Sequence, residues 1–375
     1  MIVEAFLRWA EKAKTADRAR AAAALGRAFL MARITPRERA AAAMAMTYLL
    51  DDPSPRVRLA LAEVLADTPK APRAVVMSLA EDQPDIASTI ILRSPALTDA
   101  DLVDLVGRGS TMTRALVASR ISLSRAVSAA IAEVGEWAEV LTLLENSGAE
   151  ISRATLKRLA ERHGADGDIR SLLLQRDELP ADARHLLMLR VSEALAGFDL
   201  VRVAVGNERA RRITAEARDA GTVSLAGSTA VAELPALVEH LRIDGRLTPA
   251  FLMHALCSGK VDFIAAALVN LSGLDDRRVR SILSTGRMHA LRALYEATGL
   301  PRDVSAVFVE ATLLWRRAAT LPIGTLLQSV STQLLDRFRS ERLDATAEGE
   351  LLDMVEKLNI AEQRQMARDC ATLAA

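Results

Sequence analysis

The sequence has little of what several classes of protein require. Its only cysteines, Cys257 and Cys370, lie far apart and outside any CxxC motif, which excludes a disulfide framework and fits a reducing cytoplasm. Glu4, Arg8 and Glu11 interrupt the segment where a signal peptide needs an apolar core. No uncharged apolar run is long enough to cross a bilayer. The sequence therefore predicts a cytoplasmic protein without a transmembrane segment.

Aromatic residues and net charge are also scarce. Aromatics make up 3% of the chain, and alanine and leucine supply most of its apolar residues, which favours helices over strands. Basic and acidic residues number 48 each, so no global charge attracts nucleic acid or an anionic membrane. The excess of arginine over lysine fits phosphate recognition. Because acidic residues are interleaved along most helices, we favour a bias in composition instead.

Motifs for catalysis and cofactor binding are missing. The chain has no GxSxG, GxxxxGK[ST] or HExxH, and its Gly-Arg-Gly turn at 107–109 lacks the rest of a dinucleotide-binding loop. His240 and His254 come nearest to a metal-binding pair, but nothing in the sequence supplies a third ligand, so packing roles are favoured. Cys257 is expected to be a small buried hydrophobe. We predict no catalytic residue, no metal site and no cofactor.

What the sequence does contain is a repeated unit. Residues 49–105 hold two copies, LLDDPSPRVRLALAEVLADTP and LAEDQPDIASTIILRSPALT, and similar helix starts recur every 26–33 residues. Two helices of about eleven residues and two short turns need roughly that length. First helices are expected to start at Thr35, Thr68, Thr98, Ser124, Ser152 and Pro180. Second helices are expected to start near Ser54, Pro84, Ser110, Glu136 and Asp168.

Two stretches resemble known families. DDPSPRVRLALAEVLAD, with Asp52 in its turn and the pair Val57-Arg58, resembles a HEAT-type repeat. Residues 237–283, which begin LVEHLRIDGRLTPAFLMHALCSGK, resemble an uncharacterised alphaproteobacterial family filed as domain of unknown function 2336. Degenerate HEAT-like repeats precede this block in that family. The resemblance implies a helical-repeat fold and a bacterial origin, and it carries no known activity.

We predict an all-α fold, a right-handed α-solenoid of HEAT-like helical hairpins with a divergent helical C-terminal half. The terminal hairpin is expected to close the solenoid with its two apolar stripes, and a monomer is favoured over a homodimer. The expected regions are capping helices at 1–34, the repeat array at 35–198, a basic helix ending in the linker GTVSLAG at 199–227, the family block at 228–321, and the terminal hairpin at 322–375.

For function, we predict a cytoplasmic adaptor or regulatory module that binds another protein and has no catalytic activity. The alternative is a HEAT-like DNA-binding or DNA-repair protein of the glycosylase type, which needs a basic groove with a carboxylate and gripping aromatics. The tryptophans are scattered, and the helices of residues 98–150 lean acidic, which disfavours this alternative. The candidate interaction surface comprises Arg56, Arg58, Arg209, Arg211, Arg212 and Arg246.

Overall fold

The computed structural model describes residues 2–31, 35–320, 329–338 and 347–374. Within these ranges every regular element is a helix, and the only strand-like pairing is an isolated bridge between Leu123 and Ala149. The all-α prediction is thereby confirmed, while the right-handedness of the solenoid stays a prediction. The chain forms two compact units, Met1–Leu179 (unit 1) and Pro180–Ala375 (unit 2).

Unit 1 consists of short helices joined by short turns. They are α1 (Ile2–Lys12), α2 (Thr15–Leu30), α3 (Pro36–Leu49), α4 (Pro55–Leu65), α5 (Arg73–Ala80), α6 (Pro84–Arg93), α7 (Asp99–Arg108), α8 (Thr111–Ala118), α9 (Arg125–Val134), α10 (Trp137–Glu145), α11 (Arg153–His163) and α12 (Gly167–Leu174).

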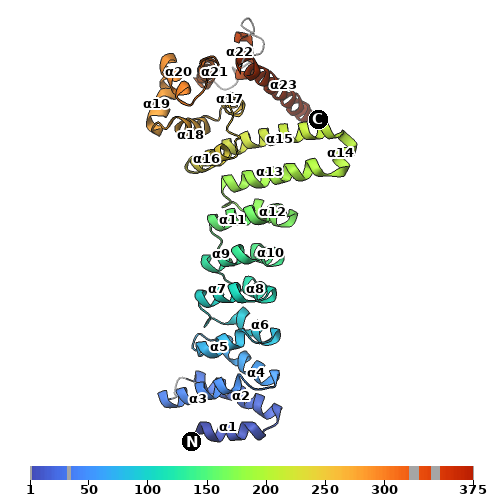
Figure 1. The fold of residues 1–375 in the computed structure, drawn as a ribbon, viewed down its shortest axis with the longest axis vertical. Coiled ribbons are helices and arrows are strands. Elements are labelled where there is room, and N and C mark those ends of the chain that lie inside the picture. Colours follow the sequence, from blue (N-terminus) through green and yellow to red (C-terminus); the bar gives the residue numbers. More distant parts are fainter. Residues whose placement is uncertain (1, 32–34, 321–328, 339–346, 375) are drawn as a thin grey trace. The chain divides into compact units, whose positions relative to one another are not determined.

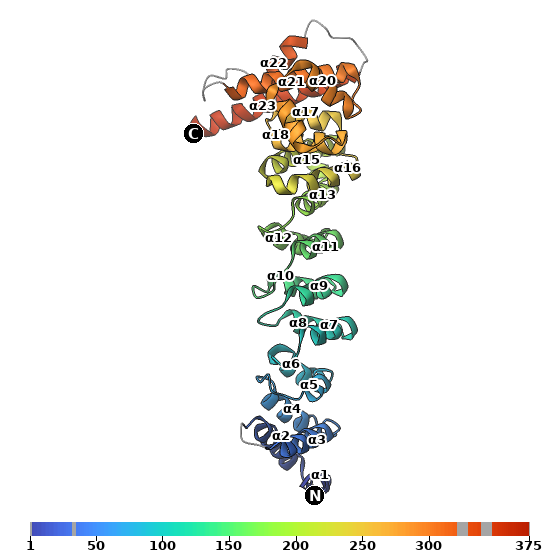
Figure 2. The same cartoon turned by 90° about the vertical axis from the view of Figure 1, so that its left-hand side faces the viewer.

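These helices stack in two parallel series, which can be followed in Figures 1 and 2. Even-numbered helices pack on one another from α2 to α12, and odd-numbered helices form the second series, with α1 on α3 and α7 on α9 on α11. The first two helices take the same steps as the later ones, because α1 contacts α3 and α2 contacts α4. The segment expected to cap the array is thus built like one of its layers.

Side-chain caps explain four of the six starts predicted for first helices. Thr35, Thr98, Ser124 and Ser152 each accept a hydrogen bond from the backbone N–H three residues later, which satisfies an orphan donor of the first turn. The start predicted at Thr68 is wrong, because α5 begins at Arg73. Pro72 forces the preceding residue into an extended conformation and cannot donate a hydrogen bond, so the helix starts only after it.

The clearest repeat buries the face that the sequence predicts. Val57, Leu61 and Leu65 of α4 are fully buried. A Cβ added at Gly26 of α2 would lie 3.0 Å from a methyl carbon of Val64, so glycine is what lets α2 approach α4 closely. Burial of Val57, Leu61 and Leu65 stabilises the fold by about 1.5–3 kcal/mol for each side chain.

Ion pairs connect successive even-numbered helices near these turns. The Arg18 guanidinium of α2 binds both carboxylate oxygens of Asp52, at 2.7 and 3.0 Å. Arg58 of α4 binds Asp82 in the same way, at 2.6 and 2.9 Å. Since Asp52 and Asp82 occupy equivalent turns of the two repeat copies, the repeated aspartate joins neighbouring layers as well as preceding a helix.

A second set of contacts caps the carboxyl ends of the even-numbered helices. We call Arg120, Asn146 and Arg176 the carbonyl ladder. Each of them directly follows an even-numbered helix and donates a hydrogen bond to the carboxyl end of the preceding even-numbered helix. Arg120 donates to the backbone oxygen of Ser94, Asn146 to that of Ala118, and Arg176 to that of Leu144. These donors satisfy carbonyl oxygens that have no partner inside their own helix.

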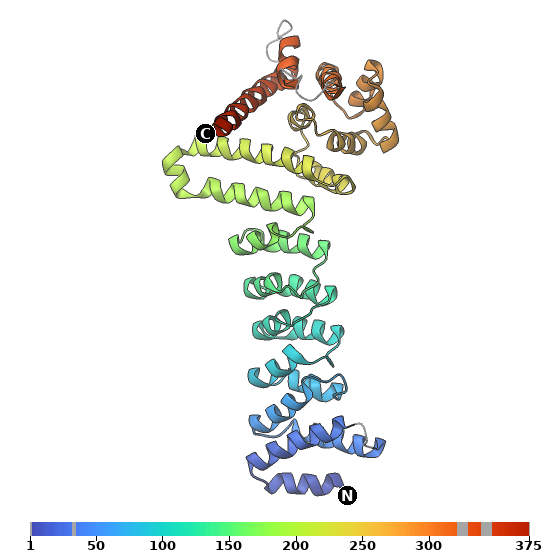
Figure 3. The ribbon, with the colours of Figure 1, turned by 180° about the vertical axis from the view of Figure 1, so that it is seen from behind.

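Unit 2 has longer and less regular helices, which Figure 3 shows from behind. They are α13 (Ala181–Gly197), α14 (Asp199–Val205), α15 (Asn207–Ser228), the 3₁₀ turn η1 (Val231–Glu233), α16 (Leu234–Ile243), α17 (Pro249–Cys257), α18 (Val261–Ser272), α19 (Asp276–Thr285), α20 (Met288–Ala297), α21 (Arg302–Thr320), α22 (Val330–Phe338) and α23 (Ala347–Ala374).

One apolar core joins most of unit 2. Helix α21 contacts α17, α20, α22 and α23, and Tyr295 of α20 is buried with its hydroxyl 2.7 Å from that of Thr312. The predicted stripes of the terminal hairpin belong to this core: Leu334, Leu351 and Val355 are buried in it. The first predicted stripe comprises Leu326, Val330, Leu334 and Phe338, and Leu326 lies outside the described residues. The described helices of the hairpin are thus part of the packing of unit 2.

Two boundaries differ from the sequence-based prediction. The division between the units falls after Leu179, whereas the array was expected to run to residue 198. The linker expected at 221–227 is wrong, because α15 continues to Ser228. A Cβ at Gly221 would lie 2.9 Å from the sulfur of Met188, and one at Gly227 would lie 2.5 Å from the Lys260 amine. These glycines allow close packing and do not break the helix.

In the described part of the chain, no individual helix combines the length and the apolar composition needed to cross a bilayer. One pair of helices, Asn207–Ser228 with Val231–Ile243, meets those two criteria jointly, with a bend of 119° between its members.

Candidate functional site

The structure separates the six arginines of the predicted interaction surface into different roles. Arg58 is mostly buried in its ion pair with Asp82, so it connects two layers of unit 1. Arg56 of the same helix is exposed. Arg209, Arg211 and Arg212 are exposed near the start of α15, and Arg212 lies 4.0 Å from Glu216. Arg246 follows α16 and lines a cleft, described below, that the α15 trio does not line.

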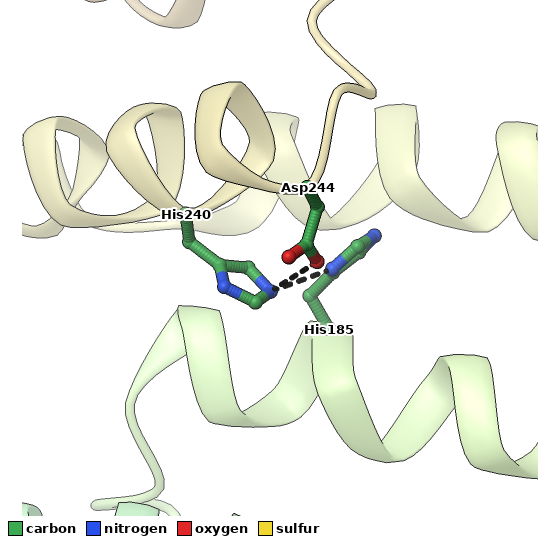
Figure 4. Close-up of side chains that lie close together, drawn as sticks. All are labelled: His185, His240 and Asp244. Atoms are coloured by element: carbon green, nitrogen blue, oxygen red, sulfur yellow. Dashed lines mark hydrogen bonds and ion pairs between the residues drawn. The ribbon is translucent and has the colours of Figure 1, made fainter.

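Histidine and aspartate side chains that are distant in sequence meet in unit 2 (Figure 4). His185 comes from α13, His240 from α16, and Asp244 from the residue that ends α16. The Nδ1 atom of His185 lies 3.1 Å from Nε2 of His240, and the same Nε2 lies 3.4 Å from Oδ2 of Asp244. We call these three residues the histidine cluster.

Local packing brings the cluster together. Leu234, Leu237 and Leu241 of α16 are buried in the core, while α16 also contacts α13. His240 and Asp244 are four residues apart and therefore lie on one face of the helix end. Gly245 adopts a φ of 66°, the left-handed conformation that commonly ends a helix.

The three residues of the cluster differ in solvent exposure. His185 is fully buried, whereas the side chains of His240 and Asp244 are 20% and 34% exposed. Burial, reinforced by the His240 ring and the Arg246 guanidinium, lowers the pKa of His185 to about 4. His185 is therefore neutral at pH 7. Its second nitrogen, Nε2, is buried and has no hydrogen-bond partner among the described residues.

The proton between the two rings has a preferred position. If His240 carries it on Nε2, that N–H points toward both the Asp244 carboxylate and the unprotonated Nδ1 of His185. In the opposite tautomer, the lone pair of His240 Nε2 would face the carboxylate, which is repulsive. The Asp244 carboxylate thus favours a proton on His240 Nε2, and the neutral His185 ring then carries its own proton on the buried Nε2.

A cleft of about 330 Å³ adjoins the cluster. Asp244 belongs to both, so the cluster and the cleft meet at this residue. Other side chains lining the cleft are Arg218, Thr222, Arg246, Phe251 and His254. His254, the histidine that the sequence paired with His240, thus lies beside the cluster and outside it. Burial lowers the pKa of His254.

Sequence reasoning missed two of the three members. The spacing of His240 and Asp244, four residues apart on one helix, was a visible signal for part of the site. His185 lies 55 residues before His240, and only the packing of α13 against α16 makes them neighbours. Cys257 is buried as predicted, and burial raises the pKa of its thiol to about 12.

Comparisons with known proteins point to a family and to nothing more specific. The family model described as "uncharacterised protein conserved in bacteria (DUF2336)" matches residues 86–357, which run from α6 into α23 and include the histidine cluster. Searches of curated proteins and of solved structures find no match. The match covers well over half of the chain and confirms the resemblance to family 2336 drawn from residues 237–283, while the alphaproteobacterial origin and the HEAT-like repeats stay predictions. The chain therefore belongs to this bacterial DUF2336 family.

Proposed function

We propose that the protein is a cytoplasmic helical-repeat adaptor or regulator that binds another protein and catalyses no reaction itself. One observation carries the proposal, the group of large apolar side chains exposed where α13, α14 and α15 meet. Val203 is 86% exposed and Leu200 is 70% exposed. The other members are Leu195, Phe198 and Ile213. We call these five residues the apolar tip.

The apolar tip has the character of a protein-binding surface. α14 lies at the free end of the α13–α15 pair in Figures 1 and 3, and among the described residues its main helix contacts are with those two helices. Clustered exposed apolar side chains mark interaction sites more often than scattered ones do. The exposed Arg209, Arg211 and Arg212 follow directly in α15. Apolar contacts beside positive charge fit an acidic amphipathic helix of a partner protein.

The arginine contacts of unit 1 favour this proposal over DNA binding. Arg18, Arg58 and Arg73 bind carboxylates of their own unit, and Arg120 donates to backbone oxygens. A guanidinium whose charge is balanced in this way contributes little to a phosphate track. The chain holds only six lysines, so arginine supplies nearly all its positive charge.

The experiment compares the full chain with two variants in a pull-down from a bacterial lysate. The double variant Leu200→Asp, Val203→Asp places negative charges on the apolar tip, where they repel an acidic partner. It should fail to pull down a protein that the wild type retains. The control is Ile121→Asp, which alters an apolar residue 91% exposed in unit 1 and should retain it.

Two further measurements test other partners. Duplex DNA and anionic phospholipid vesicles are each titrated against the same three proteins. A tight complex with DNA at physiological salt would overturn the adaptor proposal in favour of the nucleic-acid alternative. Sedimentation with vesicles that the double variant abolishes would make the apolar tip a membrane contact instead.

A further inference from the structure

We propose that His185, His240 and Asp244 form a binding site for a divalent transition-metal ion of the zinc class. The ligand atoms are Nδ1 of His185, Nε2 of His240 and a carboxylate oxygen of Asp244, which all lie within 4.8 Å of one another. Imidazole nitrogen and carboxylate oxygen are donors that zinc and its neighbours accept, whereas magnesium and calcium prefer oxygen alone.

The distances fit a common metal centre. Bonds of about 2.0–2.1 Å place two ligand atoms roughly 3.3–3.4 Å apart in a tetrahedral site and roughly 3.0 Å apart in an octahedral one. Two of the three distances between ligand atoms are 3.1 and 3.4 Å, and the third, between His185 and Asp244, is within 4.8 Å. A metal can therefore enter with small side-chain movements. Binding requires His240 to move its proton from Nε2 to Nδ1, which leaves the ring neutral.

The surroundings set the character of the site. Three protein ligands leave at least one coordination position open, as in zinc sites that take a water or another small ligand. Asp244 lies on the cleft, so we infer that the open position faces that side. Arg246 lines the same cleft, and its charge opposes a cation and favours an anionic fourth ligand, whereas the charge of Arg218 is balanced by Asp219, 3.2 Å away. The Nε2 atom of His185 lacks the outer partner that usually orients a ligating histidine.

These features predict moderate affinity, below that of a closed four-ligand structural site. They also predict that the metal joins α13 to α16, because the ligands come from both helices. Metal binding should therefore raise the thermal stability of the folded protein, since the unfolded chain does not hold the three ligands together.

The test uses Co²⁺ as a spectroscopic probe on the full chain after treatment with a chelator. We expect one Co²⁺ per chain with visible absorption bands, competition by Zn²⁺, and no effect of Mg²⁺ or Ca²⁺. His240→Ala should weaken Co²⁺ binding by more than about 100-fold, because loss of an outer-shell partner alone costs about 10–100-fold. Asp244→Asn should weaken it as well, and Arg246→Gln should strengthen it.

Two choices keep the test decisive. His240 and Asp244 are partly exposed, so their variants should fold, which circular dichroism verifies, whereas fully buried His185 is left unchanged. His289→Ala removes an exposed histidine of α20 and serves as the matched control. Equal binding by wild type and His240→Ala, or equal loss in His289→Ala and His240→Ala, would overturn the proposal. So would the absence of any rise in melting temperature with Zn²⁺.

Discussion

Adjacent helix pairs of unit 1 are joined by the same few kinds of contact, whereas the helices of unit 2 share one core. In unit 1 an arginine binds the aspartate of the next turn, and a polar side chain caps the previous helix. In unit 2 the last helix, α23, packs on α21 and also on α17, a helix that ends at Cys257 and lies far before it in sequence. Contacts between neighbouring helix pairs are therefore enough to build unit 1, whereas unit 2 depends on contacts between segments that are distant in sequence.

The largest effect that this comparison predicts follows from deleting residues 322–375. The deletion removes buried Leu334, Leu351 and Val355 and exposes apolar residues of α21 such as Val307 and Leu314. We expect the truncated protein to aggregate, as measured by size-exclusion chromatography with light scattering. A truncated protein that stays soluble and monomeric, beside a dimeric full-length chain, would make the hairpin an association element.

Within unit 1, the next largest effect should come from Leu61→Ala. Leu61 is fully buried in α4, so its truncation leaves a cavity and should lower the free energy of unfolding by roughly 2–5 kcal/mol. Arg56→Ala, on the exposed side of the same helix, should change that free energy by less than about 0.5 kcal/mol. Urea titrations followed by circular dichroism measure both. Similar losses for the two variants would mean that the helix is oriented differently.

The carbonyl ladder should contribute a smaller amount. Asn146 donates to the backbone oxygens of Ala118 and Arg120, at 2.8 and 2.7 Å. Asn146→Ala leaves both acceptors unsatisfied and should cost roughly 1–3 kcal/mol of unfolding free energy. Asn270→Ala, which removes an exposed hydrogen bond to Glu239, is the control and should be nearly neutral. Thermal melting followed by circular dichroism compares the two variants. If they have the same melting temperature, the ladder does not stabilise unit 1.

The smallest effect should appear only in acid. Arg73, followed by Thr98, lowers the pKa of Asp101 from 3.8 to about 2, against the opposing influence of burial. A lowered carboxyl pKa stabilises the folded state above pH 3.8, and that stabilisation disappears as the pH falls toward 2. We expect it to amount to about 1–2 kcal/mol, given the exposure of Arg73.

Comparison with Asp101→Asn isolates this contribution. Melting temperatures are recorded from pH 5 to pH 2 for both proteins. The wild type should be the more stable at pH 5, and the two curves should converge as Asp101 becomes protonated. Parallel curves over the whole range would assign the acid sensitivity to other carboxylates.

The sequence was sufficient for much of the fold because helix starts carry local chemical signals. Ser and Thr caps identified the starts of α3, α7, α8, α9 and α11, and the failure at Thr68 arose from a competing proline at residue 72. The glycines at 221 and 227 misled the prediction for the opposite reason. A glycine that breaks a helix and one that admits a neighbouring side chain have the same local sequence, and only packing distinguishes them.

The candidate site was less predictable because its parts come from different helices. The spacing of His240 and Asp244 indicates a shared helix face, but nothing near residue 185 reveals which helix packs there. The ladder is hidden in the same way. Arg176 and the Leu144 oxygen that it binds are 32 residues apart, and the excess of arginine looked like a bias in composition. Several of those arginines in fact satisfy helix ends or pair with acids.

The direction of the carbonyl ladder has a consequence for synthesis. Every donor in it comes later in the chain than the carbonyl oxygens that it binds, and directly follows the next even-numbered helix. A ribosome makes the earlier helix first, so its last carbonyl groups remain without this partner until roughly one more repeat has emerged. Each new helix pair then completes the pair before it. We therefore expect this part of unit 1 to gain stability stepwise from its amino-terminal side as the chain grows.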